Sequence, residues 1–246
     1  MADLGVRVAV ISDIHGNFAA LRAIVQDLES QHPDDVLVGG DLVLGGRQPA
    51  EVLNLLIERR WPAVLGNTDA FLLDLAKGTA DPSHSDRSMA AWPIDRLQHH
   101  HLAYLSALPM SHRYAPPDNR SLMLVHATPW SISEMVLPDA SEDVARRMLR
   151  EGEADVIAYG HIHFPYHRTV NGGLLVSVGG VAWSNDRDPR PAYSVVTLGR
   201  EVSVQVRRVS YDAGAEIAAL DRSGLPLSAV IRKLLRSGGS LDRLRR

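Results

Sequence analysis

The sequence predicts an α/β fold in which buried strands alternate with amphipathic helices. The first 70 residues read as strand, helix, strand, helix, strand, the order that parallel βαβ units produce. Residues 167–209 change to short strands separated by glycine-containing turns. The chain has 246 residues, which is enough for one large domain with a full core. We therefore expect a single domain that spans residues 1–246.

The strands and helices of the first half are indicated by hydrophobic spacing. A buried strand is expected over Val6–Ser12, an uninterrupted apolar run with β-branched residues. Apolar side chains at helical spacing follow over Asn17–Ser30. A second buried strand over Val36–Gly40 precedes the next helical pattern at Pro49–Arg60, and Pro62–Gly66 is expected to form a third short strand.

Turn signals organise the middle of the chain. The turn sequence Pro-Pro-Asp-Asn separates Met110–Ala115 from Ser121–His126, so these two segments are expected to form a hairpin. A short helix is expected over Ser141–Arg150, with the Ser141 side chain as its N-cap. Another buried strand is expected over Asp155–Tyr159.

Two further regions are expected to be helical. Residues 71–108 have an interrupted helical pattern, and a helical C-terminal extension is expected over about 212–246. Within that extension, the apolar stripe consists of Val230, Ile231, Leu234 and Leu235. Packing of this stripe on the domain is the simpler interpretation, and a partner surface or homo-oligomer contact is the alternative.

The composition narrows the classes of function. Hydrophobic residues make up 45% and charged residues 22%, as in an ordinary globular protein. The formal net charge of −3 argues against a dedicated nucleic-acid binder, although it does not exclude a nuclease. Signal-peptide features and a run of about 20 apolar residues are both missing, so we expect a cytoplasmic protein without a membrane partner. The absence of cysteine excludes thiolate metal sites. An excess of arginine over lysine suggests a bacterial gene.

Polar residues follow five of the predicted strands at the point where each strand ends. In chain order they are Asp13 and His15, Asp41, Asn67, His126, and His161 and His163. Glycine precedes three of these positions, which allows a sharp turn there. Because sites in open α/β sheets gather outside the carboxyl ends of the strands, we expect these side chains to converge.

The chemistry of this set indicates a binuclear metal site. Imidazole nitrogens and carboxylate oxygens suit manganese, iron, zinc or nickel, and a carboxylate can bridge two ions about 3.5–4 Å apart. Taken singly, each residue has a structural explanation: Asp13 and Asn67 as helix caps, Asp41 as a turn residue, His126 as a buried core histidine. The whole series in this order is much harder to explain by structure alone.

The motif series D-x-H, G-D, G-N-x-D, H and G-H-x-H resembles that of the calcineurin-like metallophosphoesterases, most closely their small bacterial and archaeal phosphodiesterase branch. The resemblance covers Asp13 to His163. It implies a four-layer sandwich of two mixed β-sheets flanked by helices. It also implies that Asp13, His15 and His163 hold one metal ion, that Asn67, His126 and His161 hold the other, and that Asp41 bridges them.

The same resemblance implies a hydrolase that cleaves a phosphodiester in preference to a phosphomonoester. The attack on phosphorus would come directly from a metal-bridging hydroxide, with Asp41, Asn67 and His126 as catalytic residues. The expected cofactors are two divalent transition-metal ions, manganese first, with iron, zinc and nickel as alternatives. The expected substrate is a small phosphate ester or nucleotide.

Candidate substrate contacts are Asn67, Asn17 and Arg47, and Arg47 could equally be a surface arginine. Three further residues, Trp130, Trp183 and Asn185, follow strand ends and could line the pocket or pack in the core. The run His99–His101 is expected to be solvated, since consecutive helical residues point in different directions.

One position departs from the resembling family. Many members read G-N-H-[DE], and that histidine helps to protonate the leaving oxygen, whereas this chain has Thr68 followed by Asp69. His84 is an alternative acid, although an exposed histidine is the simpler interpretation. Thr68 is also the one feature that favours a catalytically weak scaffold or regulatory binding protein over an enzyme.

Overall fold

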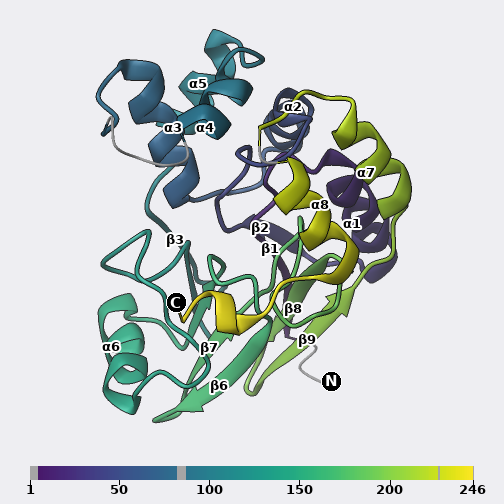
Figure 1. Cartoon of the computed structure of the whole chain (residues 1–246). Coiled ribbons are helices and arrows are strands. Elements are labelled where there is room, and N and C mark those ends of the chain that lie inside the picture. Colours follow the sequence, from purple (N-terminus) through teal and green to yellow (C-terminus); the bar gives the residue numbers. More distant parts are fainter. Residues whose placement is uncertain (1–4, 82–86, 227, 246) are drawn as a thin grey trace.

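The computed structural model describes residues 5–81, 87–226 and 228–245. Its centre consists of two mixed β-sheets (Figure 1). Across the first sheet the strands are β2 (Asp35–Val38), β1 (Val6–Ile11), β8 (Ala192–Leu198) and β9 (Val202–Arg208). Across the second sheet they are β3 (Ser111–Tyr114), β4 (Leu122–Val125), β5 (Val156–Tyr159), β7 (Gly173–Ser177) and β6 (Tyr166–Val170). In each sheet, parallel and antiparallel pairs occur together.

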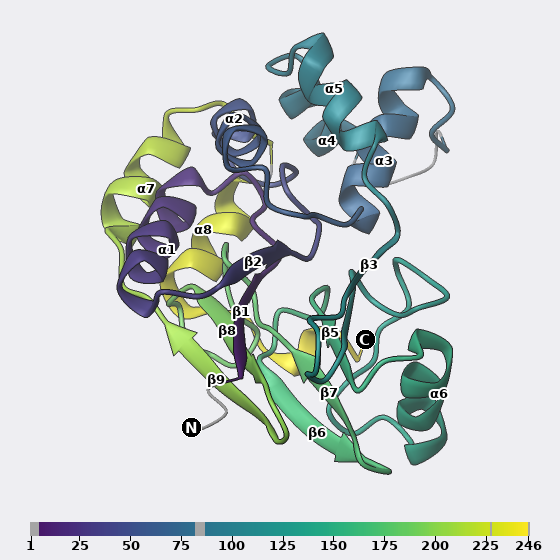
Figure 2. The same cartoon turned by 180° about the vertical axis from the view of Figure 1, so that it is seen from behind.

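Helices form the outer layers, so the predicted four-layer sandwich is confirmed (Figures 1 and 2). On the side of the first sheet lie α1 (Phe18–Gln31), α2 (Pro49–Arg59), α7 (Ala213–Asp221) and α8 (Ser228–Ser237). On the side of the second sheet lies α6 (Glu142–Gly152). At one end stand α3 (Asn67–Lys77), α4 (Arg87–Ile94) and α5 (His99–Ser106), and the short 3₁₀ helix η1 (Leu241–Arg243) is near the C-terminus. Across the described ranges, no helix has the length and apolar character needed to cross a lipid bilayer.

The period-two alternation of β1 divides the core into layers. Val8 and Val10 point between the two sheets, whereas Ala9 and Ile11 point to the opposite face, where α1 packs. A third cluster fills the space between the second sheet and α6, where Met148 packs near Ile157. Both faces of each sheet are therefore covered, which explains why the central strands read as continuous apolar runs rather than alternating ones.

Most of the predicted elements are present with small shifts of their ends. The predicted hairpin is confirmed, because β3 and β4 pair antiparallel. The predicted N-cap of α6 is confirmed, since the Ser141 hydroxyl accepts a hydrogen bond from the Val144 amide. The predicted strand over Pro62–Gly66 is wrong. Only Ala63 forms a single bridge, to Val38, because the next amide that could continue the ladder, that of Gly66, donates to the Asp69 carboxylate instead.

The C-terminal segment forms two helices. Ile231, Leu234 and Leu235 of α8 are buried, and the first and last of these pack in a cluster with residues of α7. Met89 and Trp92 of α4 pack against that cluster, so the helices at the end of the molecule touch the C-terminal pair. Val230, which completes the predicted stripe, is instead 47% exposed.

The run of three histidines was expected to be solvated, and this is wrong for His101. His99 and His100 are exposed, but the His101 side chain is buried between α5 and α2. Its Nδ1 accepts the Gln98 amide at 3.1 Å, and its Nε2 therefore donates to Asn54 Oδ1 at 3.0 Å. The ring closes the first turn of α5 and ties α5 to α2, a role that demands the neutral form.

This role predicts that the stability contributed by His101 depends on pH. Burial lowers the pKa of His101, so its contribution is fully present above the unfolded-state value of about 6.5 and is lost as the pH falls below it. We expect His101→Ala to lower the free energy of unfolding by about 1–3 kcal/mol at pH 8. The difference from wild type should shrink at pH 5. Urea unfolding at both pH values measures this, with His100→Ala as the matched control, and an equal effect of His101→Ala at both pH values would contradict the assignment.

Candidate metal centre

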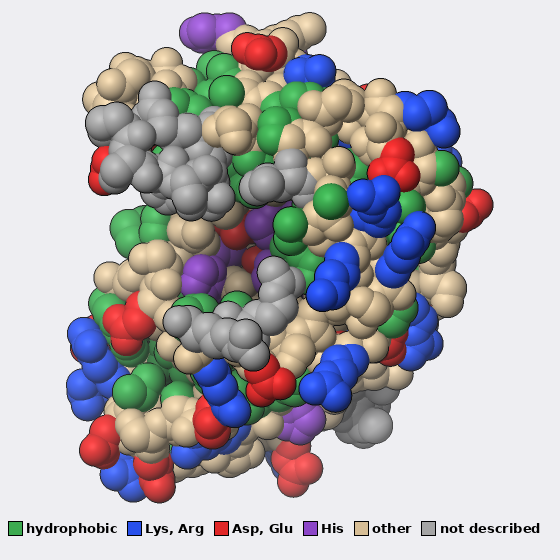
Figure 3. Space-filling model, in the orientation of Figure 1, with side chains coloured by type: hydrophobic (Ala, Val, Ile, Leu, Met, Phe, Trp, Pro, Cys, Tyr) green, Lys and Arg blue, Asp and Glu red, His purple; other side chains and the backbone are tan. Residues whose placement is uncertain are grey.

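The candidate ligands predicted from the sequence meet at one edge of the two sheets. Two pairs of neighbouring strands, β1 with β2 and β4 with β5, run parallel and end there, so the loops that follow them lie side by side. In the space-filling view this edge is a hollow with histidine and acidic side chains at its base (Figure 3). The residues form two groups of potential metal ligands, Asp13 with His15 and His163, and Asp41 with His126 and His161.

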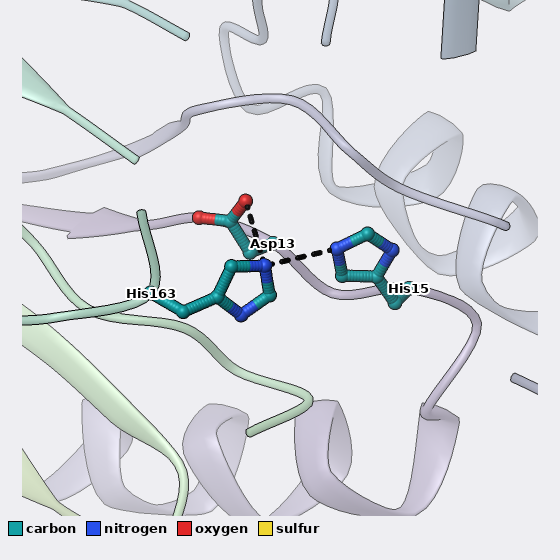
Figure 4. A group of neighbouring side chains, drawn as sticks. All are labelled: Asp13, His15 and His163. Carbon is teal, nitrogen blue, oxygen red and sulfur yellow. Dashed lines mark hydrogen bonds and ion pairs between the residues drawn. The ribbon is translucent and has the colours of Figure 1, made fainter. Parts of the chain in front are cut away.

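The first group brings together side chains from loops that are 148 residues apart (Figure 4). His163 Nε2 lies 3.4 Å from Asp13 Oδ1 and 3.1 Å from His15 Nε2. All three side chains are buried. The indole of Trp183 stacks on both imidazoles, with ring centroids 4.6 Å from His15 and 4.7 Å from His163, and so covers both rings.

Hydrogen bonds to the backbone fix the tautomers of these two histidines. His15 Nδ1 lies 2.6 Å from the Leu44 carbonyl and His163 Nδ1 lies 3.1 Å from the Trp183 carbonyl. A carbonyl oxygen can only accept, so both Nδ1 atoms carry the hydrogen, and each neutral ring presents an Nε2 lone pair. Two lone pairs that face each other at 3.1 Å repel unless a cation lies beside them. The geometry is that of two imidazoles oriented toward one metal ion.

The second group is oriented in the same way. His126 Nδ1 donates to the Gly39 carbonyl at 2.7 Å, which leaves Nε2 for a ligand. His161 uses Nε2 to donate to the Ser133 carbonyl at 3.0 Å, which leaves Nδ1. The seventh predicted residue, Asn67, lies at the start of α3, and its Oδ1 is 2.9 Å from His126 Nε2.

The carboxylate of Asp41 lies between the two groups. Its Oδ2 is 3.6 Å from His15 Nε2, and its Oδ1 is 3.5 Å from His126 Nε2. The Thr68 amide donates to Oδ1 at 2.9 Å and holds the carboxylate in this orientation. One oxygen therefore faces each group, which is the arrangement a bridging ligand needs.

The protonation of the site follows from burial and neighbouring charges. Burial lowers the pKa of His15 and His163 and lowers that of His161 to about 4, so these rings are neutral near pH 7. Burial raises the pKa of Asp13 to about 8. Burial also acts to raise the pKa of Asp41, but attraction to the His126 ring and the hydrogen bond from the Thr68 amide outweigh it, and the pKa falls to about 2. Burial acts to lower the pKa of His126, but the carboxylates of Asp41 and Asp13 outweigh it and raise that pKa. An ionised Asp13 at this position requires additional positive charge beside it.

The backbone of the site is strained. Five of the seven candidate ligands have positive φ, namely Asp13, His15, Asp41, His161 and His163, with values between 47° and 65°. Non-glycine residues adopt this region at a cost of about 1–2 kcal/mol each. A Cβ on Gly160 would lie 2.5 Å from Asp13 Oδ2, and one on Gly66 would lie 2.2 Å from Asp41 Oδ1. These two glycines precede ligand residues because no side chain fits there.

The donor atoms fit divalent transition metals. Two donors at about 2.0–2.2 Å from one ion lie about 2.8–3.6 Å apart when the angle at the ion is about 90–109°. The donor–donor distances given above, from 2.9 to 3.6 Å, fall in this range. The set contains only nitrogen and oxygen, which suits manganese, iron, zinc or nickel.

The structure places two of the predicted substrate contacts, Asn17 and Arg47, in internal hydrogen bonds. Asn17 is buried; its Oδ1 accepts the Ala20 amide as the N-cap of α1, and its Nδ2 donates to the Tyr211 hydroxyl at 3.1 Å. The Arg47 guanidinium makes three hydrogen bonds of 2.8–3.1 Å to the Glu216 carboxylate. Contact of either side chain with a substrate stays a prediction.

At the position of the family's missing histidine, Thr68 Oγ1 is buried, and within residues 5–81, 87–226 and 228–245 it has no hydrogen-bond partner. The neighbouring Asp69 is fully buried, and its two oxygens accept the amides of Leu42 at 2.9 Å and Gly66 at 3.2 Å. Asp69 therefore joins the loop that carries Asp41 to the loop that carries Asn67. His84, the alternative acid, lies outside the described residues.

Several residues that hold the site were not identified from the sequence. The carbonyls of Leu44 and Ser133 orient two of the histidines, and no sequence pattern marks a backbone acceptor. Asn185 was left open between pocket and core; it is buried, and its amide donates to the Ile162 carbonyl between the last two histidines. Glu216 had a detectable signal, because it is a lone acid within the apolar sequence Ala-Gly-Ala-Glu-Ile-Ala-Ala-Leu.

The sequence and the fold of this chain are similar to those of known proteins. A sequence model described as a calcineurin-like phosphoesterase superfamily domain matches residues 6–201. The uncharacterized protein MJ0912 of Methanocaldococcus jannaschii is 25% identical over 236 residues, 89% of this chain and 93% of that protein. A metallophosphoesterase from Sphaerobacter thermophilus is similar in structure, with a TM-score of 0.75, 26% identity and coverage of 95% and 99%. Protein PH1004 from Pyrococcus horikoshii has a TM-score of 0.81, 20% identity and coverage of 96% and 99%.

Proposed function

The chain belongs to the calcineurin-like phosphoesterase superfamily, and from this premise we propose that it hydrolyses a phosphodiester, in preference to a phosphomonoester, at a binuclear metal site. The observation that carries the proposal is the position of Asp41. Its two carboxylate oxygens face two separate groups of histidines, and each of these rings is held by a hydrogen bond to a backbone carbonyl. Burying so many oriented donors around one carboxylate has no evident structural benefit, because each buried polar group carries a desolvation cost.

In this proposal Asp13, His15 and His163 hold one ion, Asn67, His126 and His161 hold the other, and Asp41 bridges them. Manganese is the first expectation, and iron, zinc and nickel remain alternatives. When bound, two divalent ions would activate water as a nucleophile near neutral pH and would offset negative charge on the phosphate oxygens. The protein supplies the geometry: the Leu44, Gly39 and Ser133 carbonyls hold the imidazoles in single orientations.

The open side of the site suggests where the substrate lies. His161 and Asn67 are only partly buried, whereas Asp13 and His126 are fully buried. We therefore place the phosphate on the side of Asn67, whose amide nitrogen could donate to a phosphate oxygen while its Oδ1 faces His126. Figure 3 shows a hollow with histidine and acidic side chains at this place, and the substrate we propose for it is a small phosphate ester or nucleotide.

A binding scaffold without turnover is the second candidate function. Thr68 favours it, since a threonine hydroxyl is a poor general acid near neutral pH. The retention of every donor residue in the series, with each histidine held by a backbone carbonyl, favours the enzyme.

The bridging role of Asp41 gives the test that separates these two functions. We expect Asp41→Ala to lower the bound metal content and to reduce kcat/KM for a phosphodiester by about 10²–10³-fold or more, since preorganised charge at the reacting centre is lost. His100→Ala, an exposed histidine, should change neither quantity. Metal analysis and steady-state kinetics on the same samples measure both. If metal-replete Asp41→Ala hydrolyses the phosphodiester as fast as the wild-type protein, the bimetal mechanism is excluded. If the wild-type protein binds metal but hydrolyses no ester in a broad panel, the scaffold is favoured.

Thr68 predicts a preference for esters with acidic leaving groups. An alkoxide needs a proton as the P–O bond breaks, whereas an acidic phenol leaves without help, and a positioned general acid contributes about 10²–10⁴-fold. We expect kcat/KM to fall steeply as the pKa of the leaving alcohol rises along a series of aryl and alkyl phosphodiesters.

Two variants test this interpretation. Thr68→His should speed alkyl ester hydrolysis much more than aryl ester hydrolysis, because each Asp69 oxygen keeps a lone pair that could orient the introduced ring. Thr68→Ser is the matched control and should keep the wild-type slope. An equal response of alkyl and aryl substrates to Thr68→His, or a wild-type preference for alkyl monoesters, would show that another residue supplies the proton.

A further inference from the structure

The matched family domain ends at residue 201, yet residues beyond it contact the loops that carry the metal ligands. We infer that residues 211–221, here called the α7 segment, position the metal centre. Tyr211 holds the loop of His15 in place, and Glu216 holds the loop of Asp41. This inference rests on the proposed metal-dependent function.

The first contact is a buried ion pair. Glu216 lies within α7, and its side chain is only 3% exposed, against 27% for Arg47. Both Glu216 oxygens accept hydrogen bonds from the Arg47 guanidinium in a fork-like arrangement. Arg47 belongs to the loop of residues 41–48, which begins with Asp41 and leads into α2. Because a buried carboxylate is costly without its partner, the pair fixes the distance between α7 and this loop.

The same loop holds His15. The Leu44 carbonyl accepts the His15 Nδ1 hydrogen, and the Asp41 carbonyl accepts the His15 amide at 2.9 Å. The two loops are packed too tightly for any added atom, since a Cβ on Gly46 would lie 2.3 Å from the His15 carbonyl oxygen. A displacement of the 41–48 loop would therefore move the His15 ring, and with it the Nε2 atom that faces His163.

The second contact is independent of the first. Tyr211 precedes α7, and its hydroxyl accepts a hydrogen bond from the side-chain Nδ2 of Asn17. Asn17 lies two residues after His15 and also caps α1 through its other side-chain atom. The α7 segment thus holds the His15 loop on one side through Tyr211 and the Asp41 loop on the other through Glu216.

The packing between these contacts is close. Leu220 of α7 and Leu235 of α8 cover Trp183, Gly45 and His15, and the cavity between them measures only about 10 Å³. The C-terminal helices therefore close the side of the metal centre at His15, and the side at Asn67 stays open. Loss of a residue that orients a metal ligand typically weakens metal binding by about 10–100-fold.

The test uses Glu216→Gln, which keeps the side-chain shape and removes its charge, and Tyr211→Phe, which removes one hydroxyl. Asp27→Asn is the matched control. Asp27 forms a similar fork-like pair with Arg207, with side chains 19% and 26% exposed, that joins α1 to β9 away from the metal centre. Binding of Mn²⁺ is measured by calorimetric titration of each full-length protein, and folding is measured by the Tm of the same proteins without metal.

We expect Glu216→Gln to weaken Mn²⁺ binding by about 10–100-fold and Tyr211→Phe by a smaller factor. Asp27→Asn should lower Tm while leaving the affinity within about twofold. If Glu216→Gln and Tyr211→Phe both bind Mn²⁺ as wild type does, or if Asp27→Asn weakens binding equally, the inference is overturned. Should Glu216→Gln fail to fold, Tyr211→Phe alone decides between these outcomes.

A readout without metal separates this inference from the proposed function. The His15 Nδ1 hydrogen is buried against the Leu44 carbonyl, so its exchange with solvent can be followed by NMR, with assignment from the spectrum of His15→Gln. We expect exchange to accelerate at least about tenfold in Glu216→Gln and not in Asp27→Asn. Unchanged exchange contradicts the positioning role. If the wild-type protein binds no metal but exchange is still faster in Glu216→Gln, the positioning role is supported and only the proposed function is overturned.

Discussion

The structure of the site depends on the close approach of two imidazole lone pairs. His15 and His163 both commit their Nδ1 hydrogens to backbone carbonyls, so the Nε2 atoms that face each other at 3.1 Å have only lone pairs to offer. The indole of Trp183 stacks on both rings and covers them. A cation bound here would relieve this repulsion and would at the same time provide the positive charge that a buried, ionised Asp13 requires.

The packing of the rest of the fold offsets the free-energy cost of this arrangement. Five candidate ligands have left-handed backbone conformations, and each costs about 1–2 kcal/mol. That strain persists because the strands before the ligand loops belong to two sheets that pack on each other and are covered by helices on their outer faces. Fixed strand ends allow short loops to hold strained residues, and glycines such as Gly66 and Gly160 supply the space where those loops touch.

The sequence was sufficient to place the candidate ligands near strand ends, and the family resemblance was sufficient to predict the sandwich, but neither predicted the contacts that support the site. Strand ends could be located because buried strands have continuous apolar runs, and six of the seven candidate ligands follow a strand within one to four residues, Asn67 being the exception. The partners of Arg47 and Asn17 could not be located, since Glu216 and Tyr211 are 169 and 194 residues away and hydrophobic periodicity carries no information on such pairs. His101 was misplaced for the same reason, because its burial depends on α2, 47 residues earlier.

The number and position of bound metal ions test the central claim most directly. Protein saturated with Mn²⁺ should be examined by elemental analysis and by anomalous diffraction from the same preparation. The account predicts two ions per chain, one beside each group of histidines, with Asp41 in contact with both. A fully occupied structure with a single ion, or with an ion bound by His99–His101 instead, would contradict it.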